Sequence, residues 1–331
     1  MTPTATTDTN ASAPKIQSSD VTPLRMAVVG TGYLGRFHAQ KYHQLSQCEL
    51  IAISDVDKDR AAEIAGELST TAVSDHRELI GRVDAVSIAS PTRTHFAVAK
   101  ELLEAGIHVL VEKPMTVSVS EGEELINIAR TNSLVLQVGH LERFNPALLS
   151  VADQIKTPIF IESHRLAPFT SRGTDVNVVL DLMIHDIDII MHLVDAELVA
   201  IHANGSPVVS NATDIANARL EFSNGCVANV TASRVSGKTE RRMRFFQKDT
   251  YIAIDFQENT SRVCRVDRDK PDEAGIPAIN CVDENLEKGD AIRAEIEAFA
   301  DAINNGTRPL VSGEDGLRAL KTAIEIGDKL G

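Results

Sequence analysis

The strongest constraint on the fold is an alternation of short apolar runs with helical segments before residue 140. In HFAVAKELLEAG, Phe96, Ala99 and Leu103 recur at helical spacing, and Gly106 follows as a helix stop. The apolar runs are Met26–Val29, Leu50–Ile53, Ala85–Ala89, Val109–Val111 and Leu134–Val138, and the helical segments are Tyr33–Leu45, Asp57–Leu68, Thr94–Ala105 and Ser120–Thr131. Strands joined by helices of this length pair in parallel. The pattern predicts a doubly wound α/β sheet with helices on both faces.

After residue 155 the apolar pattern changes to a period of two, which is typical of strands with one covered face. The predicted strands are Ile159–Arg165, Glu197–Ala203, Ile215–Phe222, Cys226–Arg234, Arg241–Gln247, Tyr251–Phe256 and Arg262–Val266. Ser223-Asn224-Gly225 is a predicted hairpin turn, because Asn and Gly accept positive φ at little cost. Helices are predicted at Val178–Leu193, 290–304 and 314–330. These elements predict an α+β domain with a large, mostly antiparallel open sheet.

The 331 residues are too many for one ordinary domain, so we expect two. Residues 1–23 are rich in Thr, Ser, Ala and Pro and are predicted to be a disordered tail. The first domain is predicted at 24–145 and the second, for substrate binding and oligomerisation, at 146–331. Because that second sheet leaves one face uncovered, we expect a homo-oligomer, a dimer or a tetramer, that forms through it.

Charge and cysteine usage exclude several functions. The 33 basic and 47 acidic residues give a net charge of −14, which disfavours nucleic-acid binding. No unbroken apolar run exceeds four residues, so no membrane span is expected. The cysteines, at positions 48, 226, 264 and 281, show no CxxC pair, so we expect neither a disulfide framework nor a zinc site, and a cytoplasmic location.

A glycine loop follows the first predicted strand directly. Its sequence is Gly30-Thr31-Gly32-Tyr33-Leu34-Gly35, and Asp55 closes the next strand. Glycines at these positions permit a tight turn, a close approach to a pyrophosphate and close helix packing, which is the Rossmann fingerprint. A carboxylate at Asp55 would bond ribose hydroxyls and repel a 2′-phosphate, so NAD is favoured, although Arg60 leaves NADP open. The alternative is a glycine turn that binds no nucleotide.

Two further segments carry candidate catalytic side chains. Lys113 follows Glu112 at a strand end and precedes Pro114, which places it in the ligand crevice of such a sheet. The alternative is a solvated lysine. Asp181, His185 and Asp188 lie at i, i+4 and i+7 of a predicted helix, and a carboxylate beside a histidine suits a general base. A metal pair without a third ligand and a surface ion pair are the alternatives.

Taken together, GTGYLG, Asp55, SPTRTH at 90–95, VEKP at 111–114 and DLMIHDID at 181–188 resemble the Gfo/Idh/MocA family of NAD(P)-dependent sugar and polyol dehydrogenases. The resemblance implies catalytic roles for Lys113, Asp181 and His185. It also implies that cofactor is bound by Gly30, Gly32, Tyr33, Leu34, Gly35, Asp55, Ser90, Pro91, His95, Glu112 and Lys113. Where the family usually has asparagine this chain has Thr92, which removes the expected amide contact to the cofactor.

A narrower likeness lies in GHLERFNP at 139–146 and GTDV at 173–176, with His164-Arg165 between them. These segments are similar to a branch that oxidises UDP-N-acetylglucosamine at C3, ahead of an aminotransferase in lipid A synthesis. The likeness implies substrate contacts from His140, Arg143, Asn145, Arg165, Arg172, Asp181 and His185. Arginines suit a diphosphate, but each could equally be a surface charge. Oxidation of a free polyol such as inositol, oxidation of the uronic acid analogue, and non-catalytic NAD binding by a regulatory protein are the alternatives.

Oxidation of a secondary alcohol moves a hydride to NAD and a proton to a base. We expect His185, steered by Asp181, to take the proton and Lys113 to stabilise the developing oxyanion. The two roles could be reversed, because burial beside a cationic nicotinamide would lower the pKa of the lysine. No metal is expected.

Overall fold

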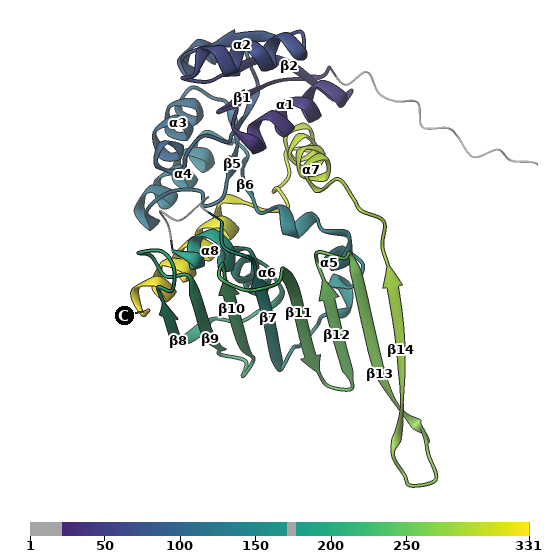
Figure 1. The fold of residues 1–331 in the computed structure, drawn as a ribbon. Helices are drawn as coiled ribbons and strands as arrows, with labels where there is room; N and C mark the ends of the chain where they lie inside the picture. The colour runs from purple at the N-terminus through teal and green to yellow at the C-terminus, as the bar shows by residue number, and fades with distance from the viewer. Residues whose placement is uncertain (1–21, 171–176, 331) are drawn as a thin grey trace, which may run out of the picture.

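The structure, a computed structural model, describes residues 22–170 and 177–330 as two sheets, one above the other, with helices packed against both (Figure 1). The predicted tail lies almost entirely outside the described residues. No helix in these described ranges is long and apolar enough to span a membrane.

The first sheet confirms the predicted doubly wound fold, with six parallel strands in the order β3-β2-β1-β4-β5-β6. The strands are β1 (Leu24–Val29), β2 (Cys48–Ser54), β3 (Thr71–Val73), β4 (Ala85–Ile88), β5 (His108–Glu112) and β6 (Leu136–Gly139). The connecting helices are α1 (Tyr33–Gln44), α2 (Lys58–Glu67), α3 (Thr92–Glu104) and α4 (Val119–Thr131). Strand β3 was not predicted, because it has only three residues and only Val73 is buried.

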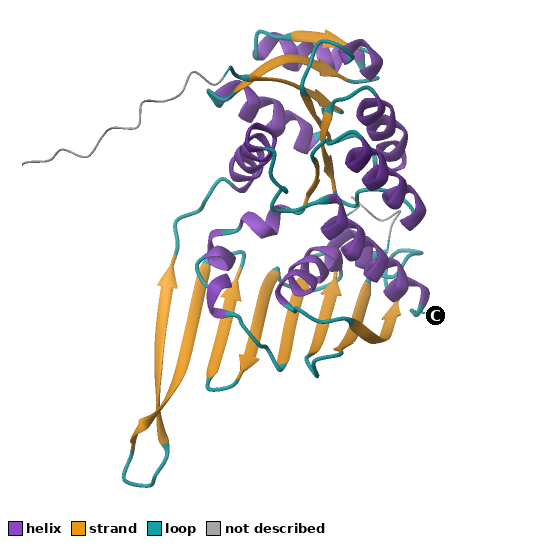
Figure 2. Ribbon diagram, turned by 180° about the vertical axis from the view of Figure 1, so that it is seen from behind, coloured by secondary structure: helices purple, strands orange, loops and turns teal. Residues whose placement is uncertain are grey.

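The second sheet confirms the predicted mostly antiparallel architecture, with eight strands in the order β14-β13-β12-β11-β7-β10-β9-β8. Only β7 and β10 pair in parallel. The strands are β7 (Phe160–Leu166), β8 (Leu198–Ser206), β9 (Ile215–Phe222), β10 (Val227–Ser233), β11 (Glu240–Gln247), β12 (Thr250–Asp255), β13 (Thr260–Pro271) and β14 (Pro277–Asn285). Helices α6 (Ile184–Leu193) and α8 (Gly313–Asp328) cover one face (Figure 2).

The opposite face of this sheet is lined largely by paired charges. Arg244 bonds Glu162 at 2.6 Å, and Arg242 bonds Asp255 at 2.7 Å. A cluster of aromatic rings, Phe160, Phe246 and Tyr251, lies on the same face. The open face therefore combines paired charges with an aromatic cluster.

Helix α7 (Ala291–Asn305) connects the end of the chain back to the first domain. It packs beside α1, and Ile296, Phe299 and Ala300 join Met26 and Val28 in one buried core cluster (Figure 1). Residues from both sides of the predicted boundary at 145 therefore build the first core, and the boundary separates only the two sheets.

The expectation of no disulfide is wrong, because Cys264 and Cys281 form one across β13 and β14. The pair could not be seen in the sequence because β14 was not predicted. Its residues are mostly exposed and give little apolar alternation. Cys48 and Cys226 are free and buried.

Candidate active site

The two domains meet at the carboxyl ends of the first sheet's strands, where Lys113 follows β5 and His140 follows β6. In the second domain, Asp181 lies in the helical turn directly before α6, and it contacts Lys113 at this carboxyl edge. The Nζ of Lys113 donates a hydrogen bond to the backbone oxygen of Asp181 at 2.8 Å and lies 4.0 Å from its Oδ1. Two predicted catalytic residues that are 68 positions apart are therefore in contact.

His185 lies beside this pair. Its ring is perpendicular to that of His140, with the ring centroids 6.4 Å apart. Its Nδ1 is buried and has no hydrogen-bond partner among the described residues. Burial, followed by the positive charge of Lys113, lowers the pKa of His185 well below its usual value. The imidazole is therefore neutral at neutral pH and can accept a proton.

The expected steering of His185 by Asp181 has no counterpart in the structure, which gives these two described residues no mutual hydrogen bond. Asp181 contacts Lys113 instead. Asp181 lies in the π-helical turn Val179–Met183, which precedes α6. The carboxylate is 4.0 Å from the ammonium of Lys113, a partner that comes from the other domain and that the spacing of residues along one helix does not reveal.

Asp188, the third residue of the predicted stripe, is buried and lies away from solvent. Its Oδ1 is 3.5 Å from Arg143 Nη1, and both side chains are 2% exposed. Asp188 therefore belongs to a buried ion pair.

The glycine loop has the geometry that the fingerprint requires. Gly30 has a φ of +89°, and a Cβ on Gly35 would lie 1.9 Å from the backbone oxygen of Gly30. A Cβ on Gly32 would meet nothing within 4 Å, so open space remains on the side where a pyrophosphate would approach. Next to the loop, Tyr33 is exposed and Leu34 half-buried. The residues present therefore fit a dinucleotide.

Asp55 lies at the end of β2 against the same loop. Its Oδ2 accepts hydrogen bonds from the backbone nitrogen and the hydroxyl of Thr31, each at 2.6 Å. Burial opposes ionisation, but these bonds and one from Asp57 lower the pKa of Asp55. The carboxylate is thus ionised beside the loop, where a ribose would bind.

His95 connects two loops that border the cofactor region. Its Nε2 lies 2.8 Å from the carbonyl oxygen of Ser90, and its Nδ1 lies 3.0 Å from that of Pro114. Ser90 also bonds Thr94 through its hydroxyl at 2.7 Å, and Pro91 is the N-cap residue of α3. His95 is buried, so its part in cofactor binding would be to fix these loops.

Glu112 points inward, away from Lys113, into a buried polar cluster that the sequence did not reveal. Its Oε1 lies 3.2 Å from His38 Nε2, and the ring's Nδ1 lies 2.9 Å from Ser87 Oγ. Glu295 of α7 is fully buried, and neither of its carboxyl oxygens has a hydrogen-bond partner in the described part of the chain. Ligand atoms of His38, Glu112 and Glu295 all lie within 4.8 Å of one another, so these three could hold a cation or share a proton.

A proton on Glu295 has a measurable consequence for stability. Burial and the neighbouring Glu112 raise the pKa of Glu295 well above its usual value, so folding binds a proton there. Above the unfolded pKa of about 4.3, stability is lost as the pH rises. We expect the wild-type Tm to fall more steeply than that of Glu295→Gln between pH 5 and 9, measured by thermal melting. The exposed Asp301→Asn on the same helix is the control and should follow the wild type; parallel slopes for Glu295→Gln would contradict the assignment.

Two of the arginines predicted to bind substrate, Arg165 and Arg143, are paired with other residues of the protein. Arg165 is buried and bonds Asp186 and Glu142, each at 2.8 Å. Arg143 is buried against Asp188 and donates to the carbonyl oxygen of Leu310 at 3.1 Å. Since carboxylates occupy both guanidinium groups, neither is free for a diphosphate.

Asn145 caps α5 (Pro146–Leu149) through its Oδ1 and donates to the carbonyl oxygen of Phe256 at 3.2 Å. It therefore connects the first domain to the end of β12. Arg172 and the segment 173–176 lie outside the described residues.

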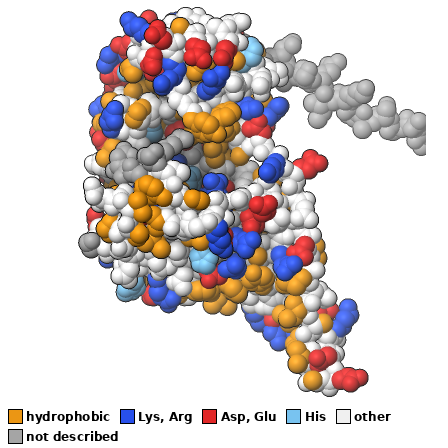
Figure 3. All heavy atoms as spheres, in the orientation of Figure 1, with side chains coloured by type: hydrophobic (Ala, Val, Ile, Leu, Met, Phe, Trp, Pro, Cys, Tyr) orange, Lys and Arg blue, Asp and Glu red, His pale blue; other side chains and the backbone are white. Residues whose placement is uncertain are grey.

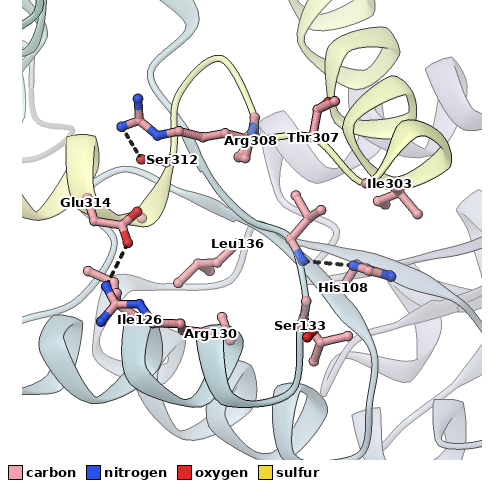
Figure 4. A pocket seen from close by; sticks show the side chains of 16 residues that line it. His108, Ile126, Arg130, Ser133, Leu136, Ile303, Thr307, Arg308, Ser312 and Glu314 are labelled. Atoms are coloured by element: carbon pink, nitrogen blue, oxygen red, sulfur yellow. Dashed lines mark hydrogen bonds and ion pairs between the residues drawn. The ribbon is translucent and has the colours of Figure 1, made fainter.

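A cavity of about 500 Å³ lies at the opposite end of β6, between α4 and the loop that leads into α8 (Figure 4). Arg130 bonds Glu314 at 3.1 Å there, and Arg308 bonds Ser312 at 2.8 Å. Because its cations are already paired and it lies at the amino end of the strand, it is no part of the catalytic cluster.

Comparison with known proteins agrees with this fold. Residues 24–140 match the model of an oxidoreductase family with an NAD-binding Rossmann fold, and residues 160–252 match the GFO/IDH/MocA C-terminal domain. The chain is 42% identical over 304 residues to UDP-N-acetylglucosamine 3-dehydrogenase of Acidithiobacillus ferrooxidans, covering 92% of this chain and 96% of that one. A solved structure of that enzyme superposes with a TM-score of 0.86 at 40% identity, covering 93% and 98% of the two chains. The myo-inositol 2-dehydrogenase of Thermotoga maritima is 28% identical over 319 residues, 90% of this chain and 93% of that one.

The fold and site thus define an NAD-dependent dehydrogenase that acts on a CH–OH group. The chain belongs to the Gfo/Idh/MocA oxidoreductase family, which confirms the resemblance seen in the sequence.

Proposed function

We propose that this protein oxidises the C3 hydroxyl of UDP-N-acetylglucosamine to the 3-keto nucleotide sugar, with NAD as the hydride acceptor. The observation that carries the proposal is the convergence of Lys113 and His185 at the carboxyl end of β5, in a chain 42% identical to an enzyme of that activity. Inositol dehydrogenases in the same family are less similar, at 28% identity for the Thermotoga maritima enzyme.

In the proposed mechanism, bound NAD supplies the hydride acceptor, held by Gly30, Gly32 and Asp55 at the carboxyl edge of the sheet. His185 accepts the proton of the C3 hydroxyl, since its imidazole is neutral at neutral pH. The ammonium of Lys113, held by the carbonyl oxygen of Asp181, donates a hydrogen bond to the same oxygen and stabilises its developing negative charge. Asp181 is thus a positioning residue for Lys113.

Incubation of the protein with NAD and UDP-N-acetylglucosamine, followed by mass spectrometry, tests the proposal. We expect a nucleotide sugar lighter by two hydrogens and a stoichiometric amount of NADH. Turnover of inositol or of the uronic acid analogue, without turnover of the nucleotide sugar, would reassign the substrate. Tight NAD binding without NADH formation from any of these alcohols would indicate a non-catalytic regulatory protein.

We propose that the open face of the second sheet joins copies of the chain into a dimer or tetramer. The support is its breadth, together with the aromatic cluster of Phe160, Phe246 and Tyr251 on that face. Light scattering at micromolar concentration should give a multiple of the 35.8 kDa chain mass. A monomer would contradict this.

We also propose a cytoplasmic location and an aminotransferase as the next enzyme for the product. A ketone at C3 is the substrate class of such an enzyme, which would install a 3-amino group for lipid A. Addition of a sugar aminotransferase and an amino donor should consume the ketone and so increase the yield of NADH. An unchanged yield of NADH would contradict the proposed next enzyme.

Cell fractionation should recover the protein with the cytoplasmic fraction. Recovery in another fraction would contradict the proposed location.

A further inference from the structure

Arg241 lies in the crevice between the domains, and its guanidinium is not buried in an ion pair. Arg241 is the second residue of β11, and its side chain is 49% exposed. Its nearest acidic contact is long, 3.7 Å from Nη1 to Glu142 Oε1, and Glu142 is already bonded to Arg165 at 2.8 Å. Arg241 is therefore available to an anionic ligand.

The strand register explains why Arg241 points into the crevice. Along β11, Met243 and Phe245 are fully buried beneath the helices, so Arg241 projects from the same face two residues earlier. It lies opposite Arg165 of β7 in the register, at the end of the sheet nearest the first domain. Arg242 projects from the other face, where it pairs with Asp255.

A cavity of about 490 Å³ opens at this position. Its polar lining includes Asn145, Thr239, Arg241, Gln257 and Lys288. Lys288 is exposed and has no hydrogen bond or ion pair with any described residue. Figure 3 shows Lys and Arg side chains close to the hollow between the two domains. The cavity thus offers two uncommitted cations with amide and hydroxyl groups beside them.

The cavity adjoins the catalytic residues. Asn145 lines it and lies five residues after His140, in the segment that leaves β6. Arg241 is near enough to His185 to be among the cations that lower its pKa, after burial and Lys113. In the nucleotide sugar, the oxidised C3 is a ring carbon and the diphosphate is attached to C1 of the same ring, so their binding sites must be adjacent.

We propose that this cavity binds the diphosphate of the nucleotide sugar, with Arg241 and Lys288 as its cationic ligands. The inference rests on the proposed function. It assigns the diphosphate to Arg241 and Lys288 instead of Arg143 and Arg165, which are already paired with carboxylates. Arginine suits this role because its planar fork donates two parallel hydrogen bonds to phosphate oxygens, and lysine adds a second charge. Thr239 and Gln257 line the same cavity and supply further polar groups.

Arg241→Gln and Lys288→Gln test the assignment. A hydrogen bond to a charged group is typically worth enough to change affinity by about 10- to 100-fold. We expect each variant to raise the KM for UDP-N-acetylglucosamine and the Kd for UDP, measured by calorimetry, by about that factor. The KM for NAD should not change, and kcat should stay within a few-fold. Arg241→Lys should recover part of the affinity.

Arg242→Gln is the matched control, because it removes a neighbouring arginine from the same strand but on the opposite face. It should leave the KM and the Kd unchanged, and thermal melting should show all variants to be folded. Wild-type affinity for UDP in both Arg241→Gln and Lys288→Gln would overturn the site while leaving the proposed function intact. A wild-type protein that neither binds UDP nor oxidises the nucleotide sugar would overturn both.

Discussion

Replacement of Lys113 by methionine is expected to lower kcat by about 10²–10⁴-fold, with NAD affinity retained. The ammonium is held at 2.8 Å by the carbonyl oxygen of Asp181 and is the charge that would stabilise the alkoxide. Methionine keeps the chain length and apolar packing but removes that charge. His185→Ala should cause a loss of similar size, because His185 is half-buried whereas the neighbouring His140 is buried.

Steady-state kinetics with NAD titrated by fluorescence measure both effects. Lys100→Met, which removes an exposed lysine paired with Glu124, is the matched control and should keep wild-type turnover. The pH profile separates the two catalytic roles. If His185 is the base, the acidic limb of kcat in Lys113→Met should move to higher pH, because the nearby positive charge no longer lowers the pKa of the imidazole. If both single variants turn over like the wild type, the site is elsewhere.

Replacement of Gly35 by alanine is expected to destabilise the protein by about 3 kcal/mol or more, because a Cβ there would lie 1.9 Å from the backbone oxygen of Gly30. That oxygen belongs to the turn between β1 and α1 and cannot move without displacing the turn. Thermal melting should show a large drop in Tm and loss of NAD binding.

Gly32→Ala is the contrasting variant in the same loop. Its Cβ would meet no protein atom within 4 Å, so the Tm should stay within about 2 °C of the wild type. NAD affinity should fall at least about tenfold, because the methyl group would occupy space that the pyrophosphate needs. Equal effects of the two substitutions on Tm would contradict the division of roles between the two glycines.

The parallel sheet and its glycine loop could be predicted because their signals are local. Three glycines at this spacing indicate a dinucleotide loop only when a strand precedes them and a helix follows, and Gly30, Gly32 and Gly35 meet this condition. Asp55 follows at the end of the next strand. The order of these elements fixes where the carboxyl ends of the strands meet. Lys113 and His140 follow two such ends, so their place in the crevice could be inferred as well.

The partners of the charged side chains could not be predicted. Arg165 is a reasonable phosphate ligand in the sequence, yet the fold buries it against Asp186 and Glu142. Arg241, one of several arginines in a strand, has no distinctive sequence signal. The partner of Asp181 could not be predicted either, because it is Lys113, 68 positions away in the sequence.

The sequence by itself determined the architecture, the dinucleotide loop and the family, because each follows from the order and spacing of neighbouring residues. The tertiary structure alone decided which charges neutralise one another and which remain free. It brought Glu295 beside Glu112, paired Cys264 with Cys281, and left Arg241 open to the crevice. These outcomes depend on contacts between segments that are separated in the sequence, which the order and spacing of neighbouring residues do not specify.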